Sequence, residues 1–188
     1  MQKLYFGLDI STTTVGFSSI VIEDEKIKII SSIFYKPNKD DDLIKMLSDT
    51  KCFIINQMQT AQKEYNLEPI IAIEDIILCM IKTTAQTTTL LSAINRVLCV
   101  ASYELYNKPI SLLPVQTIRA TIRKKAGLKG RLEKENVPKA IEKIMRKYNK
   151  KWKFEMELNR NKKPKPENYD RADAIAVALA LAIRNEDL

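Results

Sequence analysis

The sequence predicts an α/β fold with a mixed β-sheet, in which three antiparallel strands precede parallel strands and helices cover both faces. Three observations favour this fold. The first 35 residues contain three apolar stretches joined by short turns, and later apolar stretches alternate with helical patterns. The chain then ends in an alanine-rich segment that is apolar nearly all round. Strands that alternate with helices are typical of parallel pairing.

The N-terminal part of the chain is predicted to form a meander followed by a helix. Strands are expected at Lys3–Ile10, Gly16–Ile22 and Ile27–Tyr35, where side chains alternate in polarity. The acidic residues Asp40–Asp42 are then predicted to open a helix that runs to about Tyr65, because carboxylates stabilise helix N-termini.

The middle of the chain is predicted to supply the parallel strands and most of the remaining helices. A short, continuously apolar run such as Ile70–Glu74 is typical of a strand buried on both faces. The further elements expected are a helix at Thr83–Tyr106, a strand at Ile110–Leu113, a helix at Pro114–Ala126, a turn at Gly127–Gly130 and a helix at about Leu132–Tyr148.

The last forty residues are predicted to form a mobile basic loop and a buried helix. Asn149–Asn168 contains seven Lys and Arg residues and two prolines and lacks helical periodicity. The segment that follows, YDRADAIAVALALAIRN, is apolar on almost every side and should therefore be buried. A chain of 188 residues with 45% hydrophobic residues is expected to form a single domain, residues 1–188.

Composition also predicts where the protein acts. No stretch approaches the roughly 20 apolar residues of a membrane span, and the N-terminus has no secretory signal pattern. The three cysteines, Cys52, Cys79 and Cys99, lie in apolar segments without a C-x-x-C pair, so we expect small, buried and inert side chains. The expected location is intracellular, cytoplasmic or virus-encoded and acting in a host cell, and not secreted.

The absence of histidine excludes several kinds of catalytic site. The sequence contains no His residue, so Ser-His-Asp triads, Cys-His pairs and His-containing zinc sites are excluded in their usual forms. Any catalysis must use carboxylates, lysines, hydroxyls or a hard metal ion.

The charge is distributed unevenly along the chain. Arg119–Lys165 holds 18 Lys and Arg against 5 Asp and Glu, a balance of +13, which leaves −5 for the rest of a chain whose net charge is +8. A basic segment attached to an acidic body is typical of proteins that bind polyanions such as nucleic acid. A solvated lysine-rich surface is the alternative.

Four acids occupy positions where a lone carboxylate is costly. Asp9 lies within an apolar strand and Glu74 ends another, while Asp170 and Asp173 share one face of the first turn of the last helix. If the two strands are parallel neighbours, Asp9 and Glu74 emerge side by side, and the helix can bring its aspartates to them. Such a cluster needs a positive group, and without histidine or thiolate ligands we expect Mg²⁺ or Mn²⁺.

Each acid also has a structural explanation. Asp9 precedes Ser11 and Thr12 and is compatible with an ordinary turn, and Asp170 is compatible with a helix cap. Glu74 and Asp75 point to opposite faces of the strand, so only one of them can join the cluster; Glu74 is the choice and Asp75 the alternative.

The blocks GLDISTTTVGF, IAIEDII and DRADAIAVALAL resemble the RuvC family of Holliday junction resolvases, which have a ribonuclease H-like fold. The resemblance implies a homodimeric, metal-dependent endonuclease that cuts four-way DNA junctions symmetrically. It places the catalytic, metal-binding acids at Asp9, Glu74, Asp170 and Asp173. It also implies phosphate-contacting or charge-stabilising roles for Arg119 and Lys134, Lys134 being counted with the catalytic residues. The expected DNA-binding residues are Arg119, Arg123, Lys124, Lys125, Lys129, Arg131 and Lys134.

The cluster itself suggests a reaction. Two divalent ions about 4 Å apart are expected to activate a water and stabilise the leaving 3′ oxygen, giving a 5′ phosphate and a 3′ hydroxyl. Ile77 occupies the place where the family can wedge a junction open. The apolar stripe Leu90, Leu91, Ile94, Val97, Leu98 and Ala101 is expected to cover the sheet and to contact a second copy.

Three alternatives stay open at this stage. A nuclease acting on flaps or on replication or packaging intermediates has the same acids, and a catalytically silent DNA-binding relative has the same fold. GLDISTTTVG also resembles the first phosphate loop of sugar kinases and actin-like proteins. That class needs a second repeated domain, for which this chain is too short, so no nucleotide cofactor is expected.

Overall fold

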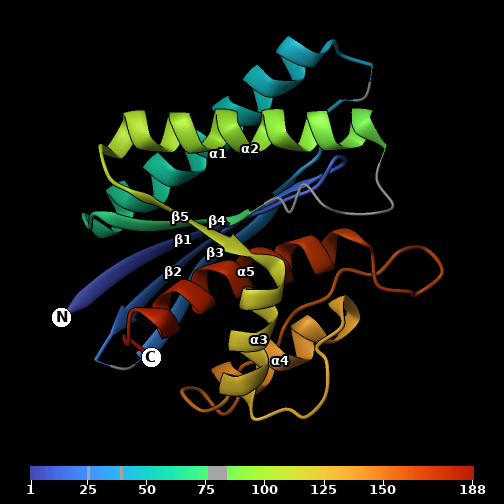
Figure 1. The fold of residues 1–188 in the computed structure, drawn as a ribbon. Coiled ribbons are helices and arrows are strands. Elements are labelled where there is room, and N and C mark those ends of the chain that lie inside the picture. Colours follow the sequence, from blue (N-terminus) through green and yellow to red (C-terminus); the bar gives the residue numbers. More distant parts are fainter. Residues whose placement is uncertain (25, 39, 76–83) are drawn as a thin grey trace.

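The protein is built around a five-stranded mixed sheet. The computed structural model describes residues 1–24, 26–38, 40–75 and 84–188 (Figure 1). The strands lie in the order β3-β2-β1-β4-β5. They span Gln2–Ile10 (β1), Val15–Glu23 (β2), Lys26–Tyr35 (β3), Pro69–Asp75 (β4) and Ile110–Pro114 (β5). The pairs β1–β2 and β2–β3 are antiparallel, whereas β1–β4 and β4–β5 are parallel, so the predicted sheet is confirmed.

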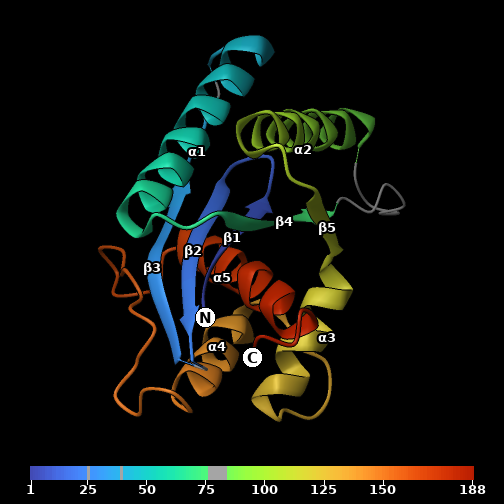
Figure 2. The same cartoon turned by 90° about the vertical axis from the view of Figure 1, so that its left-hand side faces the viewer.

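Helices cover both faces of this sheet, as predicted. The helices are α1 (Leu43–Tyr65), α2 (Ala85–Tyr106), α3 (Val115–Ala126), α4 (Val137–Met145) and α5 (Glu167–Arg184). Figure 2 shows α1 and α2 on one face of the sheet and α3, α4 and α5 on the other. None of the helices in the described part of the chain is long and apolar enough to cross a membrane.

Local sequence accounts for the ends of several helices. Asp42 accepts a hydrogen bond from the backbone N–H of Lys45 and caps α1, which confirms the helix start expected at the acidic cluster. Thr84 caps α2 in the same way through the N–H of Thr87. Gly127 ends α3 with a φ of 63°, a left-handed conformation that costs glycine little.

The helix expected at about Leu132–Tyr148 is shorter than predicted. Residues Lys134–Asn136 form a 3₁₀ turn, and α4 begins only at Val137, with Pro138 in its first turn. Proline lacks an N–H and fits the first helical turn, so it fixes the start of the helix there.

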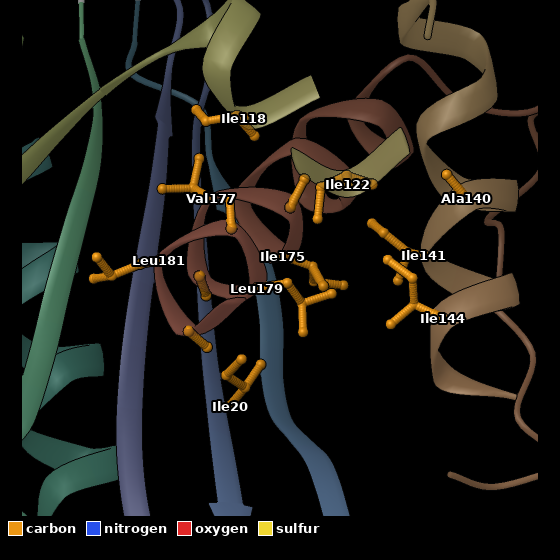
Figure 3. Packing of buried hydrophobic residues seen from close by; sticks show 14 of the residues in the cluster. Ile20, Ile118, Ile122, Ala140, Ile141, Ile144, Ile175, Val177, Leu179 and Leu181 are labelled. Carbon is orange, nitrogen blue, oxygen red and sulfur yellow. The ribbon is translucent and has the colours of Figure 1, made fainter. Parts of the chain in front are cut away.

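The core has two halves, one on each side of the sheet. In Figure 3, Ile175, Val177, Leu179 and Leu181 of α5 lie among apolar side chains of the sheet, α3 and α4, including Ile20. The second half packs α1 and α2 against β1, β2 and β4 and includes Phe6, Phe17, Ile54 and Leu98. The prediction that the last helix is buried is confirmed, because Ala172–Ala182 is buried throughout.

Two glycines allow α5 to lie against the sheet. A Cβ atom at Gly16 would come within 2.4 Å of the Asp170 carbonyl oxygen. A Cβ atom at Gly7 would come within 2.3 Å of the Ala174 oxygen. Both distances are far below van der Waals contact, so a side chain at either position would push α5 away from β1 and β2.

The basic segment Asn149–Asn168 is irregular, as expected, but it is anchored to the body of the protein. Phe154 is buried, with only 6% of its surface exposed. The Asn168 amide donates 2.8 Å and 2.9 Å hydrogen bonds to the carbonyls of Glu157 and Lys165 and accepts one from the Glu157 N–H. The burial of Phe154 and the hydrogen bonds of Asn168 therefore attach this segment to the body of the protein.

The expectation that the cysteines are buried is met only in part at Cys99 and is wrong at Cys52. Cys99 is half-buried, and burial raises the pKa of its thiol. Cys52 is exposed, because α1 turns Thr50, Ile54 and Met58 inward and leaves position 52 on the outer face. Cys79 and Ile77 lie outside the described residues.

Candidate active site at the ends of β1 and β4

The two central strands bring two of the candidate acids together. Leu8 of β1 pairs with Ile73 of β4 in a parallel register, so Asp9 and Glu74 follow side by side at the same edge of the sheet. Their side chains share a hydrogen bond. This is the arrangement expected for acids at the carboxyl ends of neighbouring parallel strands.

Helix α5 brings the other two acids to the same place. Asp170 and Asp173 are both buried, each with 8% of its surface exposed. The charge of Asp170 acts on Asp9, that of Asp9 acts on Asp173, and that of Asp173 acts on Glu74, so the four carboxyls lie within electrostatic range of one another. We refer to Asp9, Glu74, Asp170 and Asp173 as the acid cluster.

The structural explanations considered for Asp9 and Asp170, an ordinary turn and a helix cap, do not agree with the positions of these residues. Ser11 forms the turn after β1, because its Oγ atom accepts a 3.0 Å hydrogen bond from the Thr14 N–H. Asp170 lies inside the first turn of α5, where Pro166 occupies the cap position. Asp75 lies near Cys99 of α2, on the opposite face from the acid cluster, so the strand directs Glu74 and not Asp75 to the cluster.

Lys134 supplies a positive charge within the acid cluster. Its Nζ atom lies 2.8 Å from Oδ1 of Asp170 and 3.6 Å from Oδ2 of Asp173. Burial alone would lower the pKa of Lys134, but the hydrogen bond to Asp170 and the charges of Asp9, Asp170 and Asp173 raise it above its ordinary value. The lysine therefore stays charged.

The carboxyls of Asp9, Glu74 and Asp173 hold protons more tightly than exposed acids do. Burial, and then the charge of neighbouring acids, raises the pKa of Asp9 well above its usual range. Burial raises the pKa of Glu74 to about 7, although the hydrogen bond from Asp9 opposes the shift. Burial and the charge of Asp9 raise the pKa of Asp173 to about 7. Desolvation and like charge both disfavour ionisation, and the two effects act together here.

Lys134 offsets part of the repulsion among the acids, since its Nζ atom lies beside Asp170 and Asp173. The divalent ion that the sequence suggested stays a prediction. Within the described ranges, no three acidic, cysteine or histidine side chains already have the spacing of a metal site. The donor set of four carboxylates nevertheless has the chemistry that Mg²⁺ and Mn²⁺ prefer.

Sequence reasoning did not find the groups that hold the acids in place. Thr14 is buried, and its hydroxyl donates a 2.6 Å hydrogen bond to Oδ2 of Asp170. Asn95 of α2 is also buried, and its amide donates a 3.0 Å hydrogen bond to the carbonyl of Glu74. The run of hydroxyl residues directly after Asp9 was the available signal for Thr14, whereas nothing near Asn95 in the sequence indicated its role.

Some of the basic residues predicted to bind DNA lie next to the acid cluster, and others lie outside the pocket beside it. Arg119 lies close enough for its charge to lower the pKa of both Glu74 and Asp173. Arg119, Arg123 and Arg131 line one open pocket together with Glu74. The described lining of that pocket does not include Lys124, Lys125 or Lys129, which lie on α3 and in the turn after it.

Comparison with known proteins identifies the architecture. No family model matches the sequence, and no curated protein sequence matches it. The solved structure of Thermus thermophilus RuvC in complex with a Holliday junction substrate matches 97% of this chain and 95% of its own, with a TM-score of 0.67 and 15% identity. Another structure of T. thermophilus RuvC gives a TM-score of 0.64 at 16% identity, covering 98% of this chain and 97% of its own.

A protein from yeast mitochondria has the same fold. The yeast mitochondrial Holliday junction resolvase matches 97% of this chain and 79% of its own, with a TM-score of 0.62 and 14% identity. These matches extend over almost all of this chain, including the central strands and α5. The chain therefore has the ribonuclease H-like α/β fold that RuvC and the yeast mitochondrial resolvase share.

Proposed function

We propose that the protein is a divalent-metal-dependent endonuclease that resolves four-way DNA junctions by paired, symmetric phosphodiester hydrolysis. The observation that carries this proposal is the acid cluster, in which residues far apart in sequence meet beside Lys134 at one edge of the sheet. The shared fold supports the choice of substrate, because the T. thermophilus RuvC structure holds a Holliday junction.

The acid cluster fits a hard metal ion. Asp9, Glu74, Asp170 and Asp173 offer only oxygen donors, and the charge of Lys134 lowers the pKa of Asp9, Glu74 and Asp173, so a nearby positive charge favours their ionised forms. They are the residues that would hold Mg²⁺ or Mn²⁺, and two ions per site is the proposed number. When bound, such ions supply an activated water and stabilise the charge that develops on the leaving oxygen.

The protein's own side chains have distinct roles in this proposal. Thr14 holds one oxygen of Asp170, so the carboxylate keeps a fixed orientation. Lys134 and Arg119 offset the negative charge that builds on the phosphoryl oxygens, since both are close to the acids. Hydrolysis leaves a 5′ phosphate and a 3′ hydroxyl.

Positively charged residues follow the site along the chain and are available to contact the phosphates of DNA. Two further arginines, Arg123 and Arg131, line the pocket. Lys124 and Lys125 of α3 and Lys129 of the turn after it add three basic residues to the same segment of the chain. In the proposal these groups contact the phosphate backbone. Backbone contacts position a nucleic acid without reading its sequence, and their contribution falls as salt rises.

Symmetric cutting requires two active sites, so we propose a homodimer. Ile94, Leu98 and Ala101 of the predicted apolar stripe of α2 are buried in the core. On the outer side, Val100 and Tyr103 are 55% and 53% exposed. This outer side of α2 is the proposed contact with a second copy related by a two-fold axis.

Cleavage of defined DNA substrates tests the proposal. Four-way, three-way, flap and linear duplexes would be incubated with the protein in Mg²⁺ or in EDTA. Paired nicks at symmetric positions of the four-way junction, present only with Mg²⁺, are the expected result. Equal cutting of flaps or three-way substrates would instead assign the protein to the wider class of branched-DNA nucleases.

A substitution in the acid cluster separates catalysis from binding. Asp9→Asn is expected to abolish cutting while junction binding persists, and Asp40→Asn, at an exposed position, is the matched control. A parent protein that binds junctions tightly but cuts nothing with Mg²⁺ or Mn²⁺ would identify a catalytically silent DNA-binding protein.

A further inference from the structure

A short basic hairpin directly precedes α5. Leu158 and Pro164 form an antiparallel β-bridge, and the chain reverses its direction between them. Residues 158–165 include four Lys and Arg residues and no acid. We refer to residues 158–164 as the basic hairpin. It is separate from α3 and the turn after it, which carry the basic residues considered so far.

The tip of the basic hairpin has a defined conformation. The Asn159 side chain accepts hydrogen bonds of 2.9 Å and 3.0 Å from the backbone N–H groups of Asn161 and Lys163. The Asn159 N–H also donates a 2.8 Å hydrogen bond to the Lys163 carbonyl. Lys162 has a φ of 59°, a left-handed conformation that is unfavourable for a residue with a side chain. The hydrogen bonds within the tip hold this conformation, so the basic side chains project from fixed backbone positions.

Three cations of the basic hairpin have no counter-charge. Lys165, at the base, lies 2.8 Å from a carboxylate oxygen of Glu157. Within the described residues, the side chains of Arg160, Lys162 and Lys163 form no ion pair or hydrogen bond, and all three are exposed. Like charges held this close together repel one another, so the tip favours an anionic partner.

The base of the basic hairpin is fastened to the helix that carries two acids of the site. Asn168, in the first turn of α5, is buried and forms hydrogen bonds with Glu157 before the hairpin and with Lys165 after it. Asp170 of the acid cluster follows two residues later on the same turn. The hairpin therefore has a fixed position relative to the acids.

The basic hairpin and α3 lie on opposite sides of the acid cluster. Nε of Arg171 in α5 donates a 2.9 Å hydrogen bond to the Ser32 carbonyl of β3. Lys36, directly after β3, lies 3.5 Å from Glu167 of α5. The start of α5 is thus beside β3, at one edge of the sheet, whereas α3 follows β5 at the other edge (Figure 2). Strands β1 and β4, which carry the two strand acids, lie between these edges.

We propose that the basic hairpin binds the phosphate backbone of a duplex arm of the DNA, on the side of the acid cluster opposite to α3. This inference rests on the proposed function. Neighbouring strands are about 4.8 Å apart, so β3 is about 10 Å from β1, and phosphates follow one another at about 3.4 Å along a DNA strand. The hairpin therefore contacts phosphates about three or more nucleotides from the one that is cut. DNA held on both sides of the acids lies across them in a fixed direction.

Removal of the three unpaired charges tests the basic hairpin. Arg160→Gln, Lys162→Gln and Lys163→Gln would be combined in one hairpin variant, and its binding to a long-armed four-way junction would be measured in EDTA over a range of salt concentrations. Each lost phosphate contact lowers the slope of log affinity against log salt by about 0.9, so a decrease of about 2 to 3 is expected. The affinity at about 0.1 M salt is expected to fall at least tenfold. Circular dichroism checks that the variant is folded.

A second triple variant removes the same charge elsewhere. Lys26→Gln, Lys51→Gln and Lys63→Gln replace exposed lysines at the start of β3 and on α1, away from the acid cluster. This control variant is expected to keep the affinity of the parent within about twofold, since its lysines contact no phosphate. Equal losses in the two variants, or an unchanged affinity and salt slope in the hairpin variant, would overturn the inference.

Ethylation interference locates the contact on the DNA. Ethylation removes the charge of a single phosphate and weakens binding wherever the protein contacts that phosphate. Interference about three or more nucleotides from the cut is expected with the parent and the control variant and is expected to disappear with the hairpin variant. Interference confined to the phosphates nearest the cut in all three proteins would contradict the proposal.

These measurements separate the inference from the proposed function. A protein that cuts no junction, but whose hairpin variant loses affinity and salt dependence, refutes the proposed nuclease and leaves the basic hairpin as a DNA-binding surface. A junction nuclease whose hairpin variant binds junctions with the affinity and salt slope of the parent refutes the inference alone.

Discussion

The hydroxyl of Thr14 donates a 2.6 Å hydrogen bond to Oδ2 of Asp170, and this contact joins the turn after β1 to the first turn of α5. The other oxygen of Asp170, Oδ1, lies 2.8 Å from Lys134. One carboxylate is thus held from both sides by groups 120 residues apart in the sequence. Its orientation depends on tertiary structure and not on its own helix.

Removing the Thr14 hydroxyl should weaken the site without unfolding the protein. Thr14→Val keeps the shape of the side chain but leaves Asp170 without its donor, and changes of this kind cost about 10–100-fold in metal affinity or activity. We expect this loss in junction cutting and in Mg²⁺ affinity measured by calorimetry. Thr14→Ser should restore both. Equal loss in Thr14→Ser and Thr14→Val would contradict a positioning role.

Substitution of the two adjacent acids at the end of β4 should give opposite results. Glu74 lies in the acid cluster, whereas Asp75 lies near Cys99 on the other face. Glu74→Gln is expected to reduce cutting at least 10³-fold, a loss on the order of 4 kcal/mol in transition-state stabilisation. Asp75→Asn is expected to stay within threefold of the parent. Single-turnover cleavage of a four-way junction measures both, and a reversal of the two effects would make Asp75 the ligand.

Loss of Lys134 should affect chemistry more than stability. Its side chain is 41% exposed, so the ion pair with Asp170 is partly screened by solvent and is expected to contribute less than about 1 kcal/mol to the free energy of unfolding. Lys134→Met is expected to reduce the cutting rate by about 10²–10³-fold, the usual effect of removing a group that stabilises transition-state charge. Lys139→Met, on the exposed side of α4, is the control. Normal cutting by Lys134→Met would leave the lysine with a purely structural role.

The stability of the metal-free protein should decrease as pH rises from about 5 to 8. The folded protein raises the pKa of Glu74 and of Asp173 to about 7, whereas unfolded carboxyls lose their protons near pH 4. In this interval the folded state therefore holds more protons than the unfolded state, and the free energy of unfolding falls by up to about 1.4 kcal/mol per pH unit for each proton held. The pKa values of Glu157 and Asp187 are lowered, so their contribution is already complete above pH 5.

Thermal unfolding in EDTA at several pH values measures this effect. The melting temperature of the parent should fall across the interval, and the double variant Glu74→Gln with Asp173→Asn should show a flatter profile. A parent profile that rises from pH 5 to 8 would show that the acid cluster does not retain protons in the folded state.

Gly16 should be intolerant of any side chain. A Cβ atom there would meet the Asp170 carbonyl oxygen at 2.4 Å, so Gly16→Ala must displace α5 from β2. Overpacking of this kind costs about 1–3 kcal/mol, and here it also moves two acids of the site. Urea unfolding should show the loss of stability. Gly130→Asn is the control, because a Cβ atom at Gly130 has no neighbour within 4 Å among the described residues and asparagine tolerates its positive φ of 75°.

The sequence by itself determined the order of strands and helices and the mixed sheet, and it indicated Asp9, Asp170, Asp173 and either Glu74 or Asp75 as candidate site acids. It could do so because alternation in β1–β3, the apolar run of β4 and the all-round apolarity of α5 are local patterns that report burial directly. Burial of a carboxylate within such a pattern, as at Asp9 and Asp173, costs so much folding free energy that it indicates a functional role.

Only the tertiary structure decided how the acids are oriented and what accompanies them. The choice of Glu74 over Asp75 follows from the face of β4 that packs against α5, and the burial of Thr14 and Asn95 follows from contacts between distant elements. The close approach at Gly16 and the charge of Lys134 beside Asp170 have no local signature either. Periodicity reports which side of an element faces the core, but side chains meet across elements through packing that no local pattern encodes.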